Sequence, residues 1–89
     1  MIIVIGSHEV MDFAAWKKDF DEHEPARSAA GVNLIGIYTA VSDPNHVTLI
    51  MEFPSLDAFH NFTGDPELQA GMAKAGVISR PEFKLLNKV

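Results

Sequence analysis

His23 and Arg27 are the two side chains in this sequence best placed by type and spacing to do chemistry. Residues four apart lie one turn apart on the same face of a helix. An imidazole can accept or donate a proton near neutral pH, and a guanidinium can stabilise an enolate or a carboxylate. We therefore expect His23 to act as an acid or base and Arg27 to anchor an anion. The structural alternative is that Arg27 pairs with Glu24 or a strand carboxylate, while His23 covers the edge of the core.

Aromatic side chains share the helical face that carries this pair. At 100° per residue, Phe13, Trp16 and Phe20 fall within the same narrow stripe as His23 and Arg27. Aromatic residues dominate core burial, so these rings are expected in the core. Trp16, with Phe59 from a later segment, is also a candidate wall of a substrate site.

Three further residues are candidates for binding a substrate. His8 lies at the polar end of the first predicted strand, and His60 lies in the second predicted helical region. Tyr38 is the only tyrosine, and its hydroxyl needs a partner if it is buried. Core filling is the alternative role of Tyr38.

The spacing of the histidines does not predict a metal site. His8, His23, His46 and His60 include no pair with the H-x-x-x-H or H-x-H spacing of preformed sites. A site built across the fold from His8, His23 and a carboxylate is the alternative. His46, beside a predicted turn, is expected at the surface.

Composition limits the class of protein. The chain has 89 residues, of which 47% are apolar and 21% charged, as expected for one small folded domain spanning residues 1–89. A formal net charge of −5 gives no basic footprint for nucleic acid or an anionic membrane. The chain has no cysteine, which excludes disulfides and thiolate sites. The apolar start is too short for a signal peptide or a membrane span, so we expect a cytoplasmic location.

The order of predicted elements is β-α-β-β-α-β. Asp12, Ser55 and Asp65 are the expected helix N-caps, and Pro25 is expected to break the first helix after about Glu24. The predicted strands span residues 2–9, 32–42, 46–53 and 82–89. The predicted helices span residues 12–31, with the break, and residues 55–76, restarting at Pro66. Residues 43–45, Asp-Pro-Asn, are the expected hairpin turn between the two middle strands. This order predicts a ferredoxin-like α+β fold, with two helices on one face of a four-stranded antiparallel sheet.

The predicted strands carry apolar residues on both faces. Leu34, Gly36 and Tyr38 are expected on one face of the second strand, and Ile35 and Ile37 on the other. Helices can cover one face of the sheet, so a second copy of the chain or a ligand is expected on the other. We therefore expect a homodimer through the sheet face.

The sequence resembles a family across most of its length. The shared pattern comprises His8, Val10, Asp12-Phe13, Trp16-Lys17, Phe20-Asp21-Glu22-His23, Arg27, Ala30-Gly31-Val32, Asp43-Pro44-Asn45, Ser55-Leu56, Asp65-Pro66-Glu67-Leu68, Met72 and Ala75-Gly76-Val77. It is similar to short bacterial cyclase or antibiotic-biosynthesis-monooxygenase-like proteins of the dimeric α/β-barrel superfamily. The resemblance implies two subunits packed sheet to sheet, with a ligand pocket between sheet and helices in each.

The resemblance and the residues together lead to one expected function and two alternatives. The expected function is that of a cofactor-independent enzyme, of cyclase or monooxygenase type, acting on an aromatic or polyketide-like small molecule. His23 and Arg27 would be catalytic, and His8, Tyr38, Trp16, Phe59 and His60 would contact the substrate. The alternatives are a non-catalytic module that binds a small apolar ligand and a purely structural dimer module. The resemblance implies that haem-degrading relatives use an Asn on the first strand and a Trp and a His near the second helix. This chain has Ser7 and His8 at the end of its first strand and no tryptophan outside its first helix, so haem degradation is not expected.

Overall fold

The computed structural model describes all 89 residues and contains four strands and four helices. In chain order the elements are β1 (Ile2–Glu9), α1 (Phe13–Glu22), α2 (Glu24–Ala29), β2 (Asn33–Ala40), β3 (Asp43–Phe53), α3 (Leu56–Thr63), α4 (Pro66–Lys74) and β4 (Glu82–Asn87). The expected β-α-β-β-α-β order is confirmed, with each predicted helical region divided into two short helices.

Side-chain caps begin three of the helices at the predicted residues. Asp12 accepts a hydrogen bond from the backbone N–H of Ala15 at 2.9 Å, and Ser55 accepts one from Ala58 at 3.0 Å. Asp65 does the same for Glu67 at 2.9 Å, and Pro66 follows as the first helical residue. Each cap satisfies one of the N–H groups that a helix start leaves without a partner.

The first helical region breaks near Pro25, as the sequence predicts. α1 ends at Glu22, slightly earlier than expected, because His23 is already its C-terminal boundary and Pro25 lies in the first turn of α2. Proline has no N–H to continue the bonds of α1, but it is well tolerated at a helix start. The second helical region ends with α4 at Lys74, and Gly76 follows two residues later. The φ of Gly76 is +91°, a backbone conformation that glycine adopts without steric cost.

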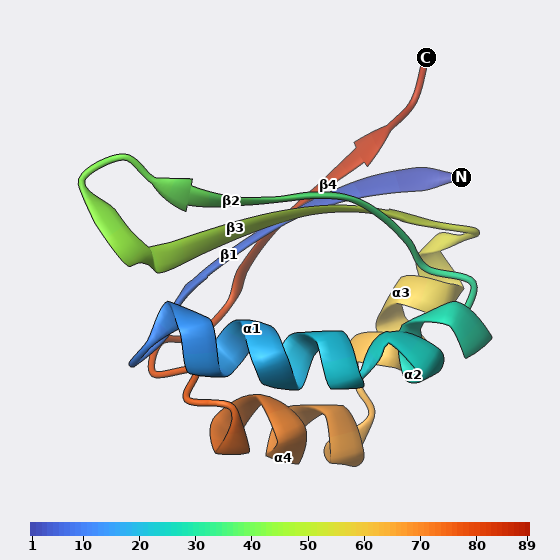
Figure 1. Ribbon diagram of the computed structural model, residues 1–89. Helices are drawn as coiled ribbons and strands as arrows, with labels where there is room; N and C mark the ends of the chain where they lie inside the picture. Colours follow the sequence, from blue (N-terminus) through green and yellow to red (C-terminus); the bar gives the residue numbers. More distant parts are fainter.

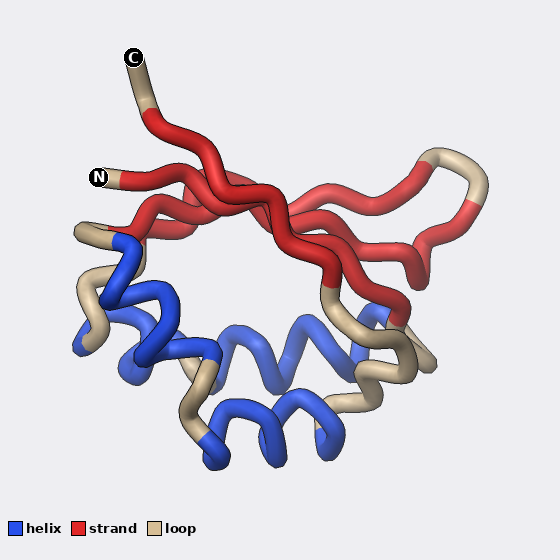
Figure 2. Tube along the Cα trace, turned by 180° about the vertical axis from the view of Figure 1, so that it is seen from behind, coloured by secondary structure: helices blue, strands red, loops and turns tan.

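The four strands form one antiparallel sheet in the order β2-β3-β1-β4. All four helices lie on the same side of this sheet, and α4 lies beneath α1, farther from the strands (Figure 1). The view from behind shows the opposite face without any helix (Figure 2). This is the predicted ferredoxin-like arrangement.

The predicted position of the hairpin turn is wrong. Asp43, Pro44 and Asn45 belong to β3, and the chain turns at Val41 and Ser42 instead. Ala40 pairs with Asp43, so two residues are enough to connect the strands. Asp43 still satisfies a local backbone group, since its Oδ1 accepts from the N–H of Asn45 at 2.9 Å.

A β-bulge at Ile35 also overturns the predicted faces of β2. Leu34 pairs with Met51, but Gly36 rather than Ile35 pairs with Ile50, so the alternation shifts by one residue. Leu34 therefore faces the helices, whereas Tyr38 faces the other side of the sheet.

The core lies between the helices and one face of the sheet. Its buried apolar residues are Val4, Val10, Trp16, Val47, Leu49, Met51, Phe53 and Phe59. The odd-numbered residues of β3 from Val47 to Phe53 point into it, as the sequence predicts. Only 11 of 89 residues are buried in the single subunit, so this core is small for the length of the chain.

The outer face of the sheet carries apolar side chains near its centre, and no helix covers it (Figure 2). Ile5 pairs with Ile50 at its centre, Leu86 is 40% exposed, and Tyr38 is 53% exposed. No helix in the structure is long and apolar enough to cross a membrane.

Candidate functional site

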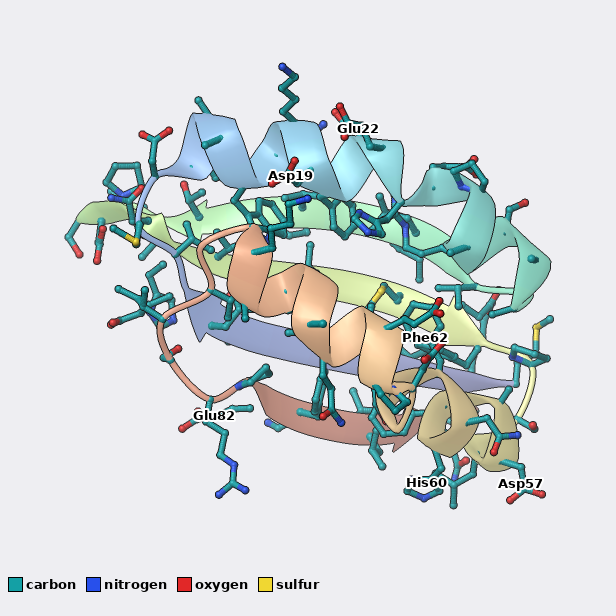
Figure 3. The ribbon with its side chains drawn as sticks, turned by 90° about the horizontal axis from the view of Figure 1, so that it is seen from below. Asp19, Glu22, Asp57, His60, Phe62 and Glu82 are labelled. Atoms are coloured by element: carbon teal, nitrogen blue, oxygen red, sulfur yellow. The ribbon has the colours of Figure 1, made fainter.

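A cavity of about 790 Å³ lies between the helices and the inner face of the sheet. Strands β1 and β3 and helices α1, α2, α3 and α4 all contribute to its wall. Its lining includes His8, Trp16, His23, Arg27 and Phe59, which are five of the seven candidate residues. Figure 3 views this side of the molecule, with α4 in front of the sheet.

Stacked aromatic rings form one wall of the cavity. Trp16 is 3% exposed and stacks on Phe20, with 4.9 Å between ring centroids. Phe59 enters from α3 and meets Phe53 and Phe83 edge to face, at 5.4 and 5.2 Å. A flat apolar ligand could pack against these ring faces, because ligand sites are usually lined by apolar and aromatic side chains.

Arg27 is buried beside this wall without an acidic partner. Its side chain is 7% exposed, its Nη1 donates to the carbonyl oxygen of Phe20 at 2.7 Å, and its guanidinium lies 3.6 Å from the centroid of the Phe20 ring. No ion pair joins Arg27 to a carboxylate, so the expected alternative of a pair with Glu24 or a strand residue is wrong.

The electrostatics of Arg27 suit an anion. Burial lowers the pKa of Arg27 below its ordinary value, and the charges of Glu24 and Asp21 partly offset that effect. The guanidinium has five N–H groups, of which one is bonded to a protein acceptor. A buried cation without a direct ion pair is unfavourable, and a bound carboxylate or enolate would relieve this cost.

His23 has one ring nitrogen occupied and one free. Nδ1 lies 2.7 Å from the carbonyl oxygen of Asp19, one turn earlier in α1. A carbonyl oxygen can only accept, so Nδ1 carries the proton and Nε2 of the neutral ring has the lone pair. The residue is exposed at the mouth of the cavity. Its Nε2 is therefore available as a base.

The break at Pro25 does not separate His23 from Arg27. The N–H of Arg27 donates to the carbonyl oxygen of His23 at 3.2 Å, which is the bond between residues four apart in a helix. Both side chains line the same cavity. The predicted pair on one helical face is therefore present in the first turn of α2.

His8 is a buried polar group at another part of the cavity wall. It is 6% exposed, lies edge to face with Trp16 at 5.5 Å, and its Nδ1 has no hydrogen-bond partner. Burial lowers the pKa of His8; its own backbone opposes this shift and the charge of His46 adds to it. Burial thus favours the neutral form of His8.

Tyr38 and His60 do not line the cavity. Tyr38 lies on the outer face of the sheet, with its ring over Gly36, because the bulge at Ile35 reverses its direction. His60 is exposed and points outward from α3 beside Asp57 (Figure 3). His46 is half-buried rather than fully at the surface, 3.8 Å from Glu9.

The structure adds three residues that sequence reasoning missed. The carbonyl of Asp19 orients His23, the ring of Phe83 covers Gly6, and Gly71 of α4 lies against His23. A glycine inside a helix costs stability relative to alanine, so Gly71 was the one available signal of a close approach. No group of three or more histidine, aspartate and glutamate side chains is arranged to hold a metal ion.

Solved structures share this fold over nearly the whole chain. A proposed antibiotic biosynthesis monooxygenase from Bordetella bronchiseptica superposes with a TM-score of 0.80 at 18% identity, covering 99% of this chain and 96% of that one. A second, from Caulobacter crescentus, has a TM-score of 0.76 at 18% identity, with coverage of 99% and 89%. The chain has the antibiotic biosynthesis monooxygenase fold.

A third structural neighbour is an oxygenase that needs no cofactor. SnoaB, a cofactor-independent oxygenase from Streptomyces nogalater, has a TM-score of 0.72 at 13% identity, covering 98% of this chain and 91% of that one. No family model matches the sequence, and no curated protein matches it. At these identities the likeness establishes the fold of the chain.

Proposed function

We propose that the chain is a homodimeric, cofactor-independent enzyme that acts on an aromatic or polyketide-like small molecule in the cavity between helices and sheet. His23 is the acid or base, Arg27 stabilises the anion that forms, and His8, Trp16 and Phe59 contact the substrate. The observation that carries this proposal is the meeting of a buried, unpaired cation and an oriented imidazole on one apolar cavity.

Proton removal is the step that these residues suit best. Nε2 of His23 would take a proton from a carbon beside a carbonyl group, and the enolate oxygen would bind the free N–H groups of Arg27. The aromatic wall would hold the ring system. In a monooxygenase reaction the carbanion then reacts with O₂, which converts a CH₂ group into a carbonyl and releases water. In a cyclase reaction the same carbon attacks an internal carbonyl.

The named chemistry of one neighbour supports the oxygenase form of this proposal. SnoaB is a cofactor-independent oxygenase on the same fold. Fold likeness alone does not transfer an activity, so the weight rests on His23 and Arg27.

Oxygen uptake with dithranol, a hydroxylated anthrone, tests the proposal. Wild-type protein should consume O₂ faster than dithranol alone, and His23→Ala should lower kcat by about 100-fold, as loss of a general base does. Arg27→Met should lower kcat by a similar factor, because the enolate loses its charged partner. Lys17→Met is the matched control, since Lys17 pairs with Asp21 on the exposed side of α1.

The binding-module alternative predicts a different outcome. Dithranol would bind and shift the indole N–H resonance of Trp16, but O₂ uptake would equal that of the uncatalysed reaction. Turnover that survives in a folded His23→Ala, Arg27→Met double variant would also contradict the catalytic roles.

A further inference from the structure

Gly71 faces the imidazole of His23 at the middle of α4. A Cβ atom built on Gly71 would lie 3.3 Å from Nε2 of His23 and 3.8 Å from its Cε1. The first distance is tighter than nine in ten contacts that real Cβ atoms make, so the ring would have to shift slightly. The ring edge that carries the free nitrogen is therefore the part of His23 that α4 approaches.

The local sequence of α4 does not account for a glycine at this position. Asp65 caps the helix, Pro66 occupies its first position and Glu67 follows in the first turn, so the helix start is well specified. Glycine is less favourable than alanine inside a helix, and the φ of Gly71 is not positive. The close approach to His23 is the feature of the structure that a side chain at this position would disturb.

His23 needs a second contact to hold its ring. The residue is exposed, and Nδ1 makes its one hydrogen bond, to the carbonyl of Asp19 at 2.7 Å. A ring held by one bond can still pivot about it. Gly71 of α4 lies at the opposite edge of the ring, next to Nε2.

We propose that Gly71 is a positioning residue for His23, which lets α4 pack against the imidazole and hold Nε2 at the cavity wall. The ring is thereby clamped between the carbonyl of Asp19 and the backbone of Gly71. The inference that this clamp serves catalysis rests on the proposed function, whereas the clamp itself can be measured without a substrate.

The clamp connects α4 to the site. α4 has no buried residue of its own, yet Leu68 and Met72 line the cavity together with His23. A ligand that contacts these side chains would press on the helix that orients the base. α4 is thus a wall of the site whose position sets that of Nε2.

Nitrogen-15 NMR of the histidine rings tests the proposal in the free protein. The neutral ring of wild-type His23 should be mainly the Nδ1–H tautomer. Gly71→Ala should remove that predominance and shift the ring resonances of His23, because the new methyl group displaces Nε2. Ala70→Gly is the matched control, since Ala70 is exposed on the same helix and outside the cavity lining. It should lower the thermal midpoint and leave His23 unchanged.

A double-mutant comparison tests the same contact when Gly71→Ala folds poorly. Alanine favours a helix over glycine, so Gly71→Ala should raise the thermal midpoint once His23→Ala removes the ring. In the presence of His23 that gain should be absent or reversed. Equal effects in both backgrounds, or an unchanged His23 tautomer in folded Gly71→Ala, would overturn the proposal.

Turnover gives a readout that separates this proposal from the proposed function. If dithranol is a substrate, Gly71→Ala should lower kcat about tenfold or more at an unchanged KM, as displacement of a catalytic group does. An unchanged kcat despite a displaced ring would refute the catalytic role of the clamp. An unchanged His23 tautomer in folded Gly71→Ala would refute the clamp whether or not the protein is an enzyme.

Discussion

Arg27 combines a structural contact with an unused binding capacity. Its Nη1 bond to Phe20 and its stacking on that ring hold the end of α1, which lacks a bond from Pro25. These contacts explain the presence of a long side chain there, but they use one of five donors and leave the charge unpaired. The remaining donors and the positive charge can therefore serve a bound anion.

His8→Phe should stabilise the folded protein while lowering the affinity of the cavity for its substrate. The buried Nδ1 has no partner, so replacing the imidazole by a ring of similar shape should raise the free energy of unfolding by about 1 kcal/mol near neutral pH. Chemical denaturation measures this change. His60→Gln, at an exposed position outside the cavity, should have little effect.

The same variant should change the pH dependence of stability. Burial lowers the pKa of His8 below its ordinary value of 6.5, so unfolding takes up a proton at pH values just below 6.5. This part of the stability of the wild type is present above pH 6.5 and is lost as the pH falls below it. His8→Phe should show a smaller loss between pH 6.5 and 5.5, and an equal loss in both proteins would contradict the role given to burial.

Site residues could be predicted from the sequence where one helix carries them. His23, Arg27 and Trp16 share a face of one helical stretch, so helical geometry alone places them together. Gly71 comes from a distant part of the chain, and no local pattern reveals which side chain meets it. Tyr38 was misplaced because its direction depends on a bulge in the pairing with β3.

At the level of elements, Pro25→Ala tests whether the helix break shapes the site. Alanine would supply an N–H that can donate to the carbonyl oxygen of Asp21, so α1 should continue past Glu22 and merge with α2. We expect stability to change by no more than about 1 kcal/mol, because proline at a helix start contributes little beyond its fixed φ. Turnover should fall, since Arg27 would lose its position under the end of α1.

Backbone chemical shifts and O₂ uptake with dithranol measure these two effects. Helical carbon shifts at residues 23–25 together with wild-type turnover would show that the break is not needed. Asp19→Ala is a useful control, because the Asp19 contact to His23 is made by its backbone carbonyl and should persist.

Helix starts were predictable because a cap is a local interaction. Asp12, Ser55 and Asp65 each bond to an N–H two or three residues later, so the sequence contains the whole motif. The hairpin turn was not predictable in this way. Asp43 and Asn45 have turn chemistry, but the pairing of Ala40 with Asp43 draws them into β3.

The whole molecule has an uncovered sheet face with an apolar centre, which we propose is the dimer interface. Ile50→Lys should produce a monomer, because burying a charge at the centre of that face is unfavourable. Light scattering should give about twice the 9.8 kDa chain mass for the wild type and the single-chain mass for the variant. Leu56→Lys, at an exposed position of α3 on the helical side, should leave the dimer intact. A wild-type mass of one chain at micromolar concentration would contradict this interface.

The order of the elements made the overall fold predictable. The β-α-β-β-α-β pattern has few ways to pack, and the structure adopts the expected one. The cavity between helices and sheet follows from that packing only in part, since its shape depends on the side chains of α4.

The most direct test of the central claim compares the affinities of 2-naphthoate and 2-naphthol for wild type, Arg27→Met and Lys17→Met. The shift of the indole N–H resonance of Trp16 measures binding in each case. The two ligands share a ring system but differ in charge at neutral pH. We predict that Arg27→Met weakens naphthoate binding by about tenfold or more, as loss of a charged hydrogen bond does, and leaves naphthol binding nearly unchanged. Lys17→Met should affect neither ligand. Equal naphthoate affinity in wild type and Arg27→Met, or no shift of Trp16 with either ligand, would contradict an anion-binding aromatic site in this cavity.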